Sequence, residues 1–292
     1  MRGPFSRRPS GAVPTPERGS DRGGLLQTDY EAYHAAGRTS EFGDVYERVR
    51  HRTVRHIVSR DPLLPTDGRL LDIGAGEGRY VPLWRALNPD AELVVTDVSA
   101  TALESSSHRH PYAEHVRCEA EDLPFPDCSF DVITSIEVIE HVRRPVHMLL
   151  ECHRTLKPGG QMLLSTPCGN AGSALWWRAA LKRQLSAGVG GGVRYGDADD
   201  PTHLRAYRRH ELETLCCAAG FVVRKTFLSA HFFTDVAERI ELEVKGRVDI
   251  RRRSEQADRA FAAALDALAM LDFWVLRRLP TGGTQILVLT RI

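Results

Sequence analysis

The 292-residue sequence has no excess of charge of either sign, no long apolar run and no cysteine spacing typical of a metal site. Its formal net charge of +1 gives no global field that would attract nucleic acid. No apolar stretch approaches the roughly 18 residues of a membrane span, and the amino terminus lacks the apolar core of a signal peptide. The six cysteines form no framework typical of secreted proteins. We therefore expect a soluble, cytoplasmic protein without general nucleic-acid binding.

The domain organisation is predicted from composition and periodicity. Residues 1–24 are rich in Arg, Gly, Pro and Ser and have little to bury, which predicts a disordered tail. Residues 25–292 are expected to form a single domain. Within it, residues 25–59 have a helical pattern, residues 168–201 have the pattern of a loop or lid, and residues 231–280 are expected to form a helical insertion.

Apolar runs alternate with helical patterns from residue 69 onwards, which predicts an α/β fold with a doubly wound, mostly parallel sheet. Ser99 is expected to cap the helix that follows the second strand. A helix over residues 145–156 is expected to be closed by Lys157-Pro-Gly-Gly160, with the fifth strand beginning at Gln161.

The segment from Arg69 to Tyr80 joins a short apolar run to a helical pattern through a glycine-rich turn. Gly74, Gly76 and Gly78 leave the turn without side chains, so a ligand can approach the backbone N–H groups at the start of the helix. The pattern is typical of a nucleotide or nucleoside site, although a purely structural turn has the same pattern.

Two carboxylates flank this turn, Asp72 and Glu77, and its third glycine comes one residue earlier than in the dinucleotide fingerprint. Carboxylates repel a pyrophosphate and attract a ligand that carries an ammonium and a sulfonium. S-adenosylmethionine is such a ligand. Asp97 ends the next apolar run, where an acid accepts hydrogen bonds from ribose hydroxyls.

The chain resembles the class I S-adenosylmethionine-dependent methyltransferases, in particular their small-molecule branch typified by ubiquinone and menaquinone biosynthesis. The resemblance rests on four blocks in order, which are Leu70–Arg79, Val94–Ser99, Cys118–Ile133, and Ile139–Val142 followed by Arg154–Gly160. It implies a seven-stranded sheet of order 3-2-1-4-5-7-6 with an antiparallel last strand.

The resemblance also implies the cofactor site. Asp72 and the loop would hold the methionine end, Asp97 the ribose, and the Glu119 segment the adenine, with Glu121 or Asp122 as alternatives to Glu119. The expected cofactor residues are Asp72, Gly74, Ala75, Gly76, Gly78, Asp97, Val98, Glu119, Ala120, Glu121 and Ile136.

His141 follows the fourth strand at the carboxyl edge, where open α/β sheets bind ligands, and its pKa suits a general base. We expect His141 and His203 to be catalytic, while in related sequences the first histidine often only orients the loop. The string Glu137, Glu140 and His141, completed by His203, also resembles metal-assisted branches and leaves a divalent ion as an alternative. A metal-free reaction is the expectation.

The predicted function is methyl transfer from S-adenosylmethionine to a small-molecule acceptor, at an oxygen. Alternatives are a metal-assisted O-methyltransferase of a diol or an RNA 2′-hydroxyl, a non-catalytic module that binds the cofactor, and an NAD-dependent oxidoreductase. The sequence does not identify the acceptor or the oligomeric state.

Overall fold

The computed structural model describes residues 45–61, 63, 67–169, 203–229, 233–234, 236–237, 240–241, 244, 255–276 and 283–292. The predicted tail, the first part of the predicted helical preamble, residues 170–201 of the loop expected to contact the acceptor and several parts of the predicted insertion lie outside the described residues.

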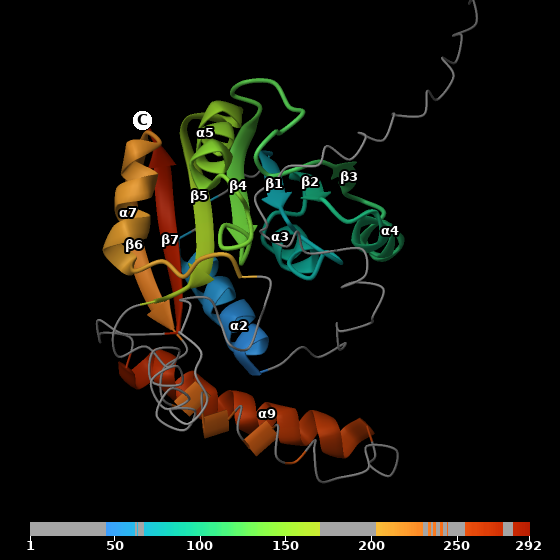
Figure 1. Cartoon of the computed structure of the whole chain (residues 1–292). Coiled ribbons are helices and arrows are strands. Elements are labelled where there is room, and N and C mark those ends of the chain that lie inside the picture. The colour runs from blue at the N-terminus through green and yellow to red at the C-terminus, as the bar shows by residue number, and fades with distance from the viewer. Residues whose placement is uncertain are drawn as a thin grey trace, which may run out of the picture.

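A seven-stranded sheet of order β3-β2-β1-β4-β5-β7-β6 forms the centre of the fold (Figure 1). The neighbours from β3 through β5 pair in parallel, whereas β7 is antiparallel to both β5 and β6. The predicted order and the antiparallel last strand are confirmed. The strands are β1 (Arg69–Ile73), β2 (Glu92–Asp97), β3 (Glu114–Arg117), β4 (Phe130–Ile136), β5 (Leu156–Pro167), β6 (Phe221–Ser229) and β7 (Thr284–Arg291).

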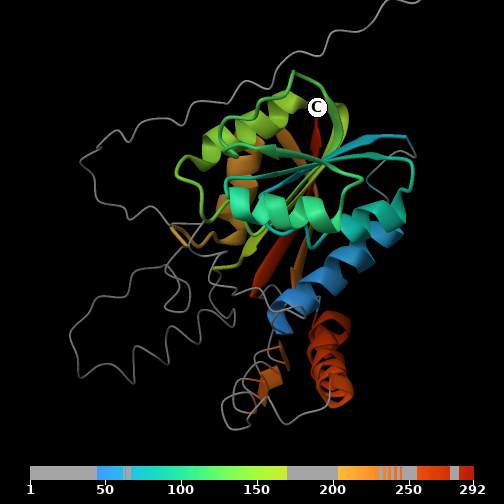
Figure 2. The same cartoon turned by 90° about the vertical axis from the view of Figure 1, so that its right-hand side faces the viewer.

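Helices cover both faces of this sheet. Apolar side chains of α5 and α7 pack on one face and those of α2, α3 and α4 on the other, and Figure 2 shows α4 and α5 on opposite sides of the strands. Ser99 caps α4 as predicted, because its hydroxyl accepts a hydrogen bond from the Ala102 N–H at 3.2 Å. The helices are α2 (Val45–Arg60), α3 (Val81–Leu87), α4 (Ala100–Arg109), α5 (Pro145–Thr155), α7 (Arg209–Ala218), α9 (Glu255–Leu271) and the π-helical turn η2 (Asp272–Leu276).

The junction between α5 and β5 differs from the prediction. The helix ends at Thr155 and the strand begins directly at Leu156, so the segment Lys157-Pro-Gly-Gly160 lies inside β5. Its pairing with β4 shifts register between Phe130 and Val132, and Gly159 has a φ of +77°. The glycines accommodate an irregularity within an extended strand here, a role that the sequence does not distinguish from ending a helix.

Helix α2 links the sheet to the insertion. Its second half packs on the sheet, and its first half packs against α9 through an apolar cluster that includes Val45, Val49 and Leu265. Figure 1 shows α2 at the end of the sheet where β5 finishes, with α9 beyond it. The predicted helical character of the insertion is confirmed over α9. Among the described residues, no helix is both long and apolar enough to cross a membrane.

Candidate active site

The glycine turn after β1 is packed so closely that side chains do not fit at two of its positions. Gly74, Gly76 and Gly78 have φ values of +63°, +56° and +78°. A Cβ at Gly74 would lie 2.5 Å from a methyl of Val138, and one at Gly78 would lie 2.3 Å from the Ser106 hydroxyl. These positions therefore require glycine, and a glycine turn at the carboxyl edge of the sheet fits the predicted nucleoside cofactor.

Asp97, at the end of β2, organises this turn. One carboxylate oxygen accepts a hydrogen bond from the Gly76 N–H at 2.8 Å, and the other accepts one from the Ser99 N–H at 2.9 Å. The side chain is nearly buried. Each carboxylate oxygen has a second lone pair, so Asp97 retains capacity to accept hydrogen bonds from ribose hydroxyls.

Asp72 lies behind the turn. Its carboxylate accepts hydrogen bonds from the Thr134 hydroxyl at 2.6 Å and from the Trp84 indole N–H at 3.2 Å. Burial raises the pKa of Asp72 to about 6. The structure thus gives Asp72 a role in joining β1, β4 and α3, and contact with the methionine end of the cofactor stays a prediction.

The other predicted cofactor residues line the same edge with different degrees of exposure. Glu119 is exposed, Ala120 is half-buried, and Val98 and Ile136 are partly exposed at the ends of β2 and β4. The Glu121 carboxylate accepts hydrogen bonds from the backbone N–H and the guanidinium of Arg144, both at 2.8 Å. Glu119 and Asp122 are both exposed, and which of the three acids contacts the adenine amine stays a prediction.

Glu137, directly after β4, has an unusual backbone conformation with a φ of +58°. Its N–H donates to the Ser165 carbonyl at 3.0 Å, and the Ser165 hydroxyl donates to one side-chain oxygen at 2.5 Å. The other oxygen forms an ion pair with Arg50 of α2 at 3.0 Å. Glu137 therefore joins the first described helix to the ends of β4 and β5.

Glu140 is fully buried in the loop that follows. One carboxyl oxygen accepts a hydrogen bond from the Thr166 hydroxyl at 2.9 Å, and the other has no hydrogen-bond partner among the described residues. Burial, reinforced by the charge of Glu137, raises the pKa of Glu140 to about 8. At neutral pH this carboxyl is therefore mostly protonated, unless a cation lies beside it.

Two histidines adjoin Glu140. The His141 Nε2 atom lies 3.9 Å from the oxygen of Glu140 that has no hydrogen-bond partner, and the rings of His141 and His203 meet edge to face with centroids 4.7 Å apart. The Leu204 N–H donates to the Glu140 carbonyl at 2.9 Å and so holds the His203 segment in place.

Ligand atoms of Glu140, His141 and His203 all lie within 4.8 Å of one another, and we call these residues the Glu-His-His cluster. The structure thus brings together three of the four residues of the predicted string. Glu137 is directed instead toward Arg50 and Ser165. The contacts of Arg50, Ser165 and Thr166 were not predicted, since no local motif marks them.

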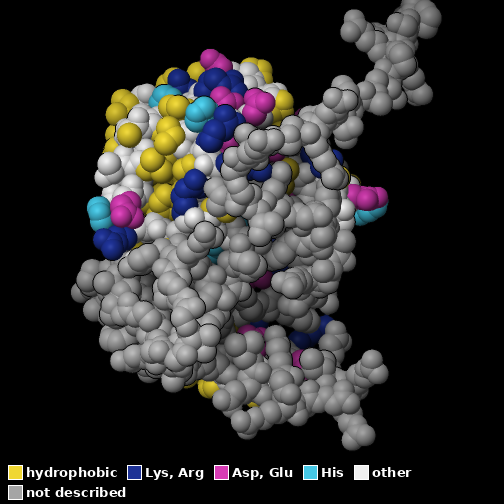
Figure 3. All heavy atoms as spheres, in the orientation of Figure 1, with side chains coloured by type: hydrophobic (Ala, Val, Ile, Leu, Met, Phe, Trp, Pro, Cys, Tyr) yellow, Lys and Arg dark blue, Asp and Glu magenta, His cyan; other side chains and the backbone are white. Residues whose placement is uncertain are grey.

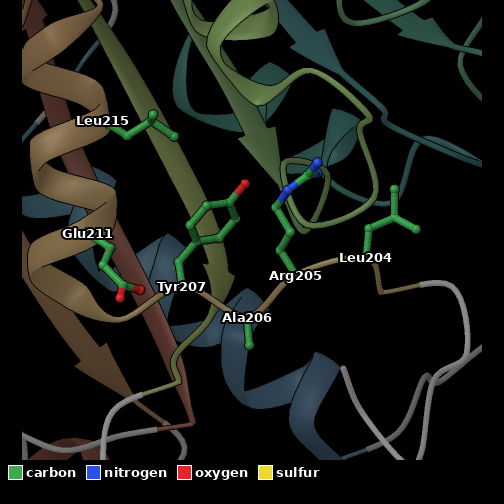
Figure 4. Close-up of a pocket in the computed structure, with 6 residues that line it drawn as sticks. All are labelled: Leu204, Arg205, Ala206, Tyr207, Glu211 and Leu215. Atoms are coloured by element: carbon green, nitrogen blue, oxygen red, sulfur yellow. The ribbon is translucent and has the colours of Figure 1, made fainter. Parts of the chain in front are cut away.

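A cavity of about 430 Å³ lies beside this loop. It is lined by residues of α7 and of the segment that precedes it, which are Leu204, Arg205, Ala206, Tyr207, Glu211 and Leu215. Figure 4 shows Arg205 and Tyr207 pointing to one side of their segment and Ala206 to the other. The Arg205 guanidinium donates to the backbone carbonyls of Val142 and Arg143, so it supports the loop that carries His141.

Comparison with known proteins identifies the family of the chain. A family model described as a methyltransferase domain matches residues 46–226. A probable S-adenosylmethionine-dependent methyltransferase of Mycobacterium tuberculosis is 28% identical over 170 residues, which are 58% of this chain and 54% of that protein. The malonyl-acyl-carrier-protein O-methyltransferase of Methylococcus capsulatus is 35% identical over 164 residues, with coverages of 54% and 53%.

A ubiquinone/menaquinone biosynthesis C-methyltransferase of Pseudomonas syringae is 29% identical over 142 residues, with coverages of 46% and 56%. The matches span only about half the length of these curated relatives. Among solved structures, a putative methyltransferase of Haloferax volcanii, in complex with the Trm112 activator, has a TM-score of 0.58 at 18% identity. That alignment covers 91% of this chain and 99% of the other, and it shows the shared fold.

Proposed function

Because the chain belongs to the methyltransferase domain family, with S-adenosylmethionine as its cofactor, we propose that it methylates an oxygen atom of a small-molecule acceptor. The observation that carries the proposal is the Glu-His-His cluster, which places imidazoles at the same sheet edge as the glycine turn. A hydroxyl acceptor must lose a proton on methylation, and an imidazole is suited to receive it near neutral pH.

In the proposed reaction the acceptor oxygen forms a bond to the methyl carbon. S-adenosylmethionine, when bound, would supply this methyl group and leave as S-adenosylhomocysteine, and His141 would receive the acceptor proton. The cofactor supplies the activated methyl group when bound, so the protein mainly has to position the acceptor and remove the proton. Glu140 and His203 would orient the His141 ring in this reaction.

A divalent metal is a second candidate for the same cluster. One buried carboxyl oxygen without a hydrogen-bond partner and two imidazoles form a donor set suited to Mg²⁺ or Mn²⁺ when water completes the coordination. The ion would keep Glu140 ionised and would acidify an acceptor hydroxyl. We favour the metal-free reaction because the Glu137 carboxylate, the second acid of the predicted string, is engaged by Arg50 and Ser165.

The distribution of charge on the surface and the named activities of the relatives both favour a small-molecule acceptor over RNA. In the space-filling view of Figure 3, basic and acidic side chains are interspersed over the described part of that face. Such mixing is unlike the continuous basic surface that tracks a phosphate backbone. The relative with an O-methyltransferase name acts on a malonyl group carried by a protein, so a carboxylate oxygen belongs in the tests beside hydroxyl oxygens.

The experiment is an acceptor screen that follows the formation of S-adenosylhomocysteine. We expect turnover with a hydroxyl or carboxyl acceptor, undiminished by EDTA. With a hydroxyl acceptor, which must lose a proton, we expect a fall of about 100-fold or more in kcat for His141→Ala. The matched control is His147→Ala, an exposed histidine on α5. Methylation at carbon only would overturn the choice of oxygen. Activity lost to EDTA and restored by Mg²⁺ or Mn²⁺ would select the metal-assisted reaction.

A further inference from the structure

Helix α9 and the turn η2 bury their acids and expose apolar side chains. Between Ala260 and Val275, every exposed side chain that the structure describes is apolar. The only charged residues of this span are Asp266 and Asp272, which are 3% and 0% exposed. A surface helix ordinarily presents polar residues to water, so this face has the composition of a contact surface.

The opposite face of α9 packs against α2. Leu265 lies with Val49 in the apolar cluster that joins the two helices. The Asp266 carboxylate pairs with the guanidinium groups of Arg48 at 2.6 Å and Arg52 at 2.8 Å. These contacts hold α9 beside α2 (Figure 2), so a fixed helix presents the outer face.

The outer face carries a regularly spaced set of side chains, which we call the α9 stripe and which consists of Ala260, Ala263, Ala267, Leu271 and Trp274. Successive members are 3, 4, 4 and 3 residues apart, so the spacing is symmetric about Ala267. The side chains are small before Ala267 and large after it, where Leu271 is 40% and Trp274 is 53% exposed. The Trp274 ring meets His56 of α2 edge to face, with centroids 5.4 Å apart, which fixes its place on the stripe.

This gradient in size makes the stripe complementary to itself. When two copies lie antiparallel with a two-fold axis at Ala267, Ala263 of one copy faces Leu271 of the second, and Ala260 faces Trp274. Each large side chain then meets an alanine, which allows the two helix axes to approach closely. The dipoles of antiparallel helices also attract each other.

We infer that the α9 stripe binds a second copy of this chain in the antiparallel arrangement. The stripe has no charged side chain that would recognise a phosphate or an acidic peptide. Three of its five members are alanines, which would bury little apolar area in a lipid surface. One pair of helices makes a small interface, so the dimer should dissociate on dilution.

The first test is sedimentation velocity of the full chain. We expect a dimer fraction that grows between about 1 μM and about 100 μM. Ala267→Glu and Ala267→Lys should each be monomeric over this range, because like charges meet on the axis, whereas an equal mixture of the two variants should dimerise. A dimer in the mixture also shows that both variants fold. Ala218→Glu is the matched control, since Ala218 is an exposed alanine on α7, and it should keep the wild-type dimer fraction.

The second test addresses the antiparallel register. Ala263→Glu and Leu271→Lys should each weaken dimerisation by more than about tenfold, and the double variant should recover about tenfold because the two introduced charges face each other between copies. Losses in both single variants without recovery in the double variant would overturn the antiparallel arrangement. A wild-type monomer at all concentrations, or a dimer unchanged by both substitutions at Ala267, would overturn the inference. A monomer that binds vesicles of phosphatidylglycerol and phosphatidylcholine, and loses this binding in Ala267→Glu, would overturn it in favour of a lipid surface.

Discussion

The two sides of the carboxyl edge satisfy their buried acids differently. On the β1–β2 side, both oxygens of Asp72 and both oxygens of Asp97 accept hydrogen bonds. On the β4–β5 side, one oxygen of Glu140 accepts a hydrogen bond from Thr166, and the other has no hydrogen-bond partner among the described residues. The pKa of Asp72 is raised to about 6 and that of Glu140 to about 8, in both cases chiefly by burial.

The two kinds of buried acid suit different tasks, since one can fix the backbone of a binding site and the other can take part in a reaction. A carboxylate with all its hydrogen bonds fixes a backbone, as Asp97 fixes the glycine turn, and it leaves the turn ready for a ligand. A buried carboxyl with an oxygen that lacks a partner keeps capacity for a proton, a neighbouring imidazole or a cation. We therefore propose that the β1–β2 side holds the cofactor in a fixed geometry and that the β4–β5 side exchanges a proton or binds a cation.

The largest expected effect is a loss of cofactor binding in a variant of the glycine turn. Gly76→Val should abolish measurable binding of S-adenosylhomocysteine, because Gly76 has a φ of +56° and a branched side chain would both strain and fill the turn. Calorimetry measures the binding. Gly159→Val is the control, since Gly159 has a φ of +77° and open space around it in β5. A Gly76 variant that binds normally would show that the turn is not the cradle.

The next effect concerns Glu140 and the pH dependence of stability. The pKa of Glu140 is raised from the ordinary 4.5 to about 8, so the folded state holds its proton more tightly than the unfolded state does. This stabilisation is complete below about pH 4.5 and is lost as the pH rises through about 8, on the order of 5 kcal/mol in total. Denaturant unfolding of wild type and Glu140→Gln from about pH 5 to about pH 9 measures it.

We expect the wild-type free energy of unfolding to fall relative to that of Glu140→Gln across this range. Asp72 titrates near pH 6 in both proteins, so its contribution cancels in the difference. Parallel curves for the two proteins would contradict the protonated state assigned to Glu140.

A smaller effect compares the two threonines that donate to these acids. Thr134→Val removes a hydrogen-bond donor from Asp72, and Thr166→Val removes one from Glu140. Both variants replace a hydroxyl by a methyl group, so they differ only in the carboxyl that loses its donor. At neutral pH Asp72 is ionised and Glu140 is protonated, so the first substitution should cost about 2 kcal/mol and the second about 1 kcal/mol. Denaturant unfolding measures both, and the reverse order would mean that the two carboxyls have been assigned the wrong charge.

Sequence reasoning succeeded where signals are local. The glycine turn, the Ser99 cap and each single strand or helix are encoded within about ten neighbouring residues. The sheet order came from the family resemblance, and His203 was placed beside His141 by the same resemblance. The end of α5 was misjudged because Lys157-Pro-Gly-Gly160 suits both a helix stop and an irregular strand.

The contacts of the site were harder to predict because they join distant segments. Arg50 meets Glu137, and Thr166 meets Glu140, only after α2, β4 and β5 have come together. No periodicity distinguishes Glu140, which is fully buried, from Glu119, which is exposed. Burial of a single acid in a loop depends on tertiary packing, and it is this burial that raises the pKa of Glu140.

The central claim is that residues at the ends of β1 and β2 bind the cofactor and residues after β4 serve the reaction. It is tested most directly by titrating S-adenosylhomocysteine calorimetrically into Asp97→Ala and His141→Ala. Asp97→Ala should bind more than about tenfold more weakly than wild type, because a carboxylate that orders the turn and accepts ribose hydroxyls is lost. His141→Ala should bind within about twofold of wild type. Equal losses in the two variants, or a loss confined to His141→Ala, would contradict the division of the edge into a cofactor side and a reactive side.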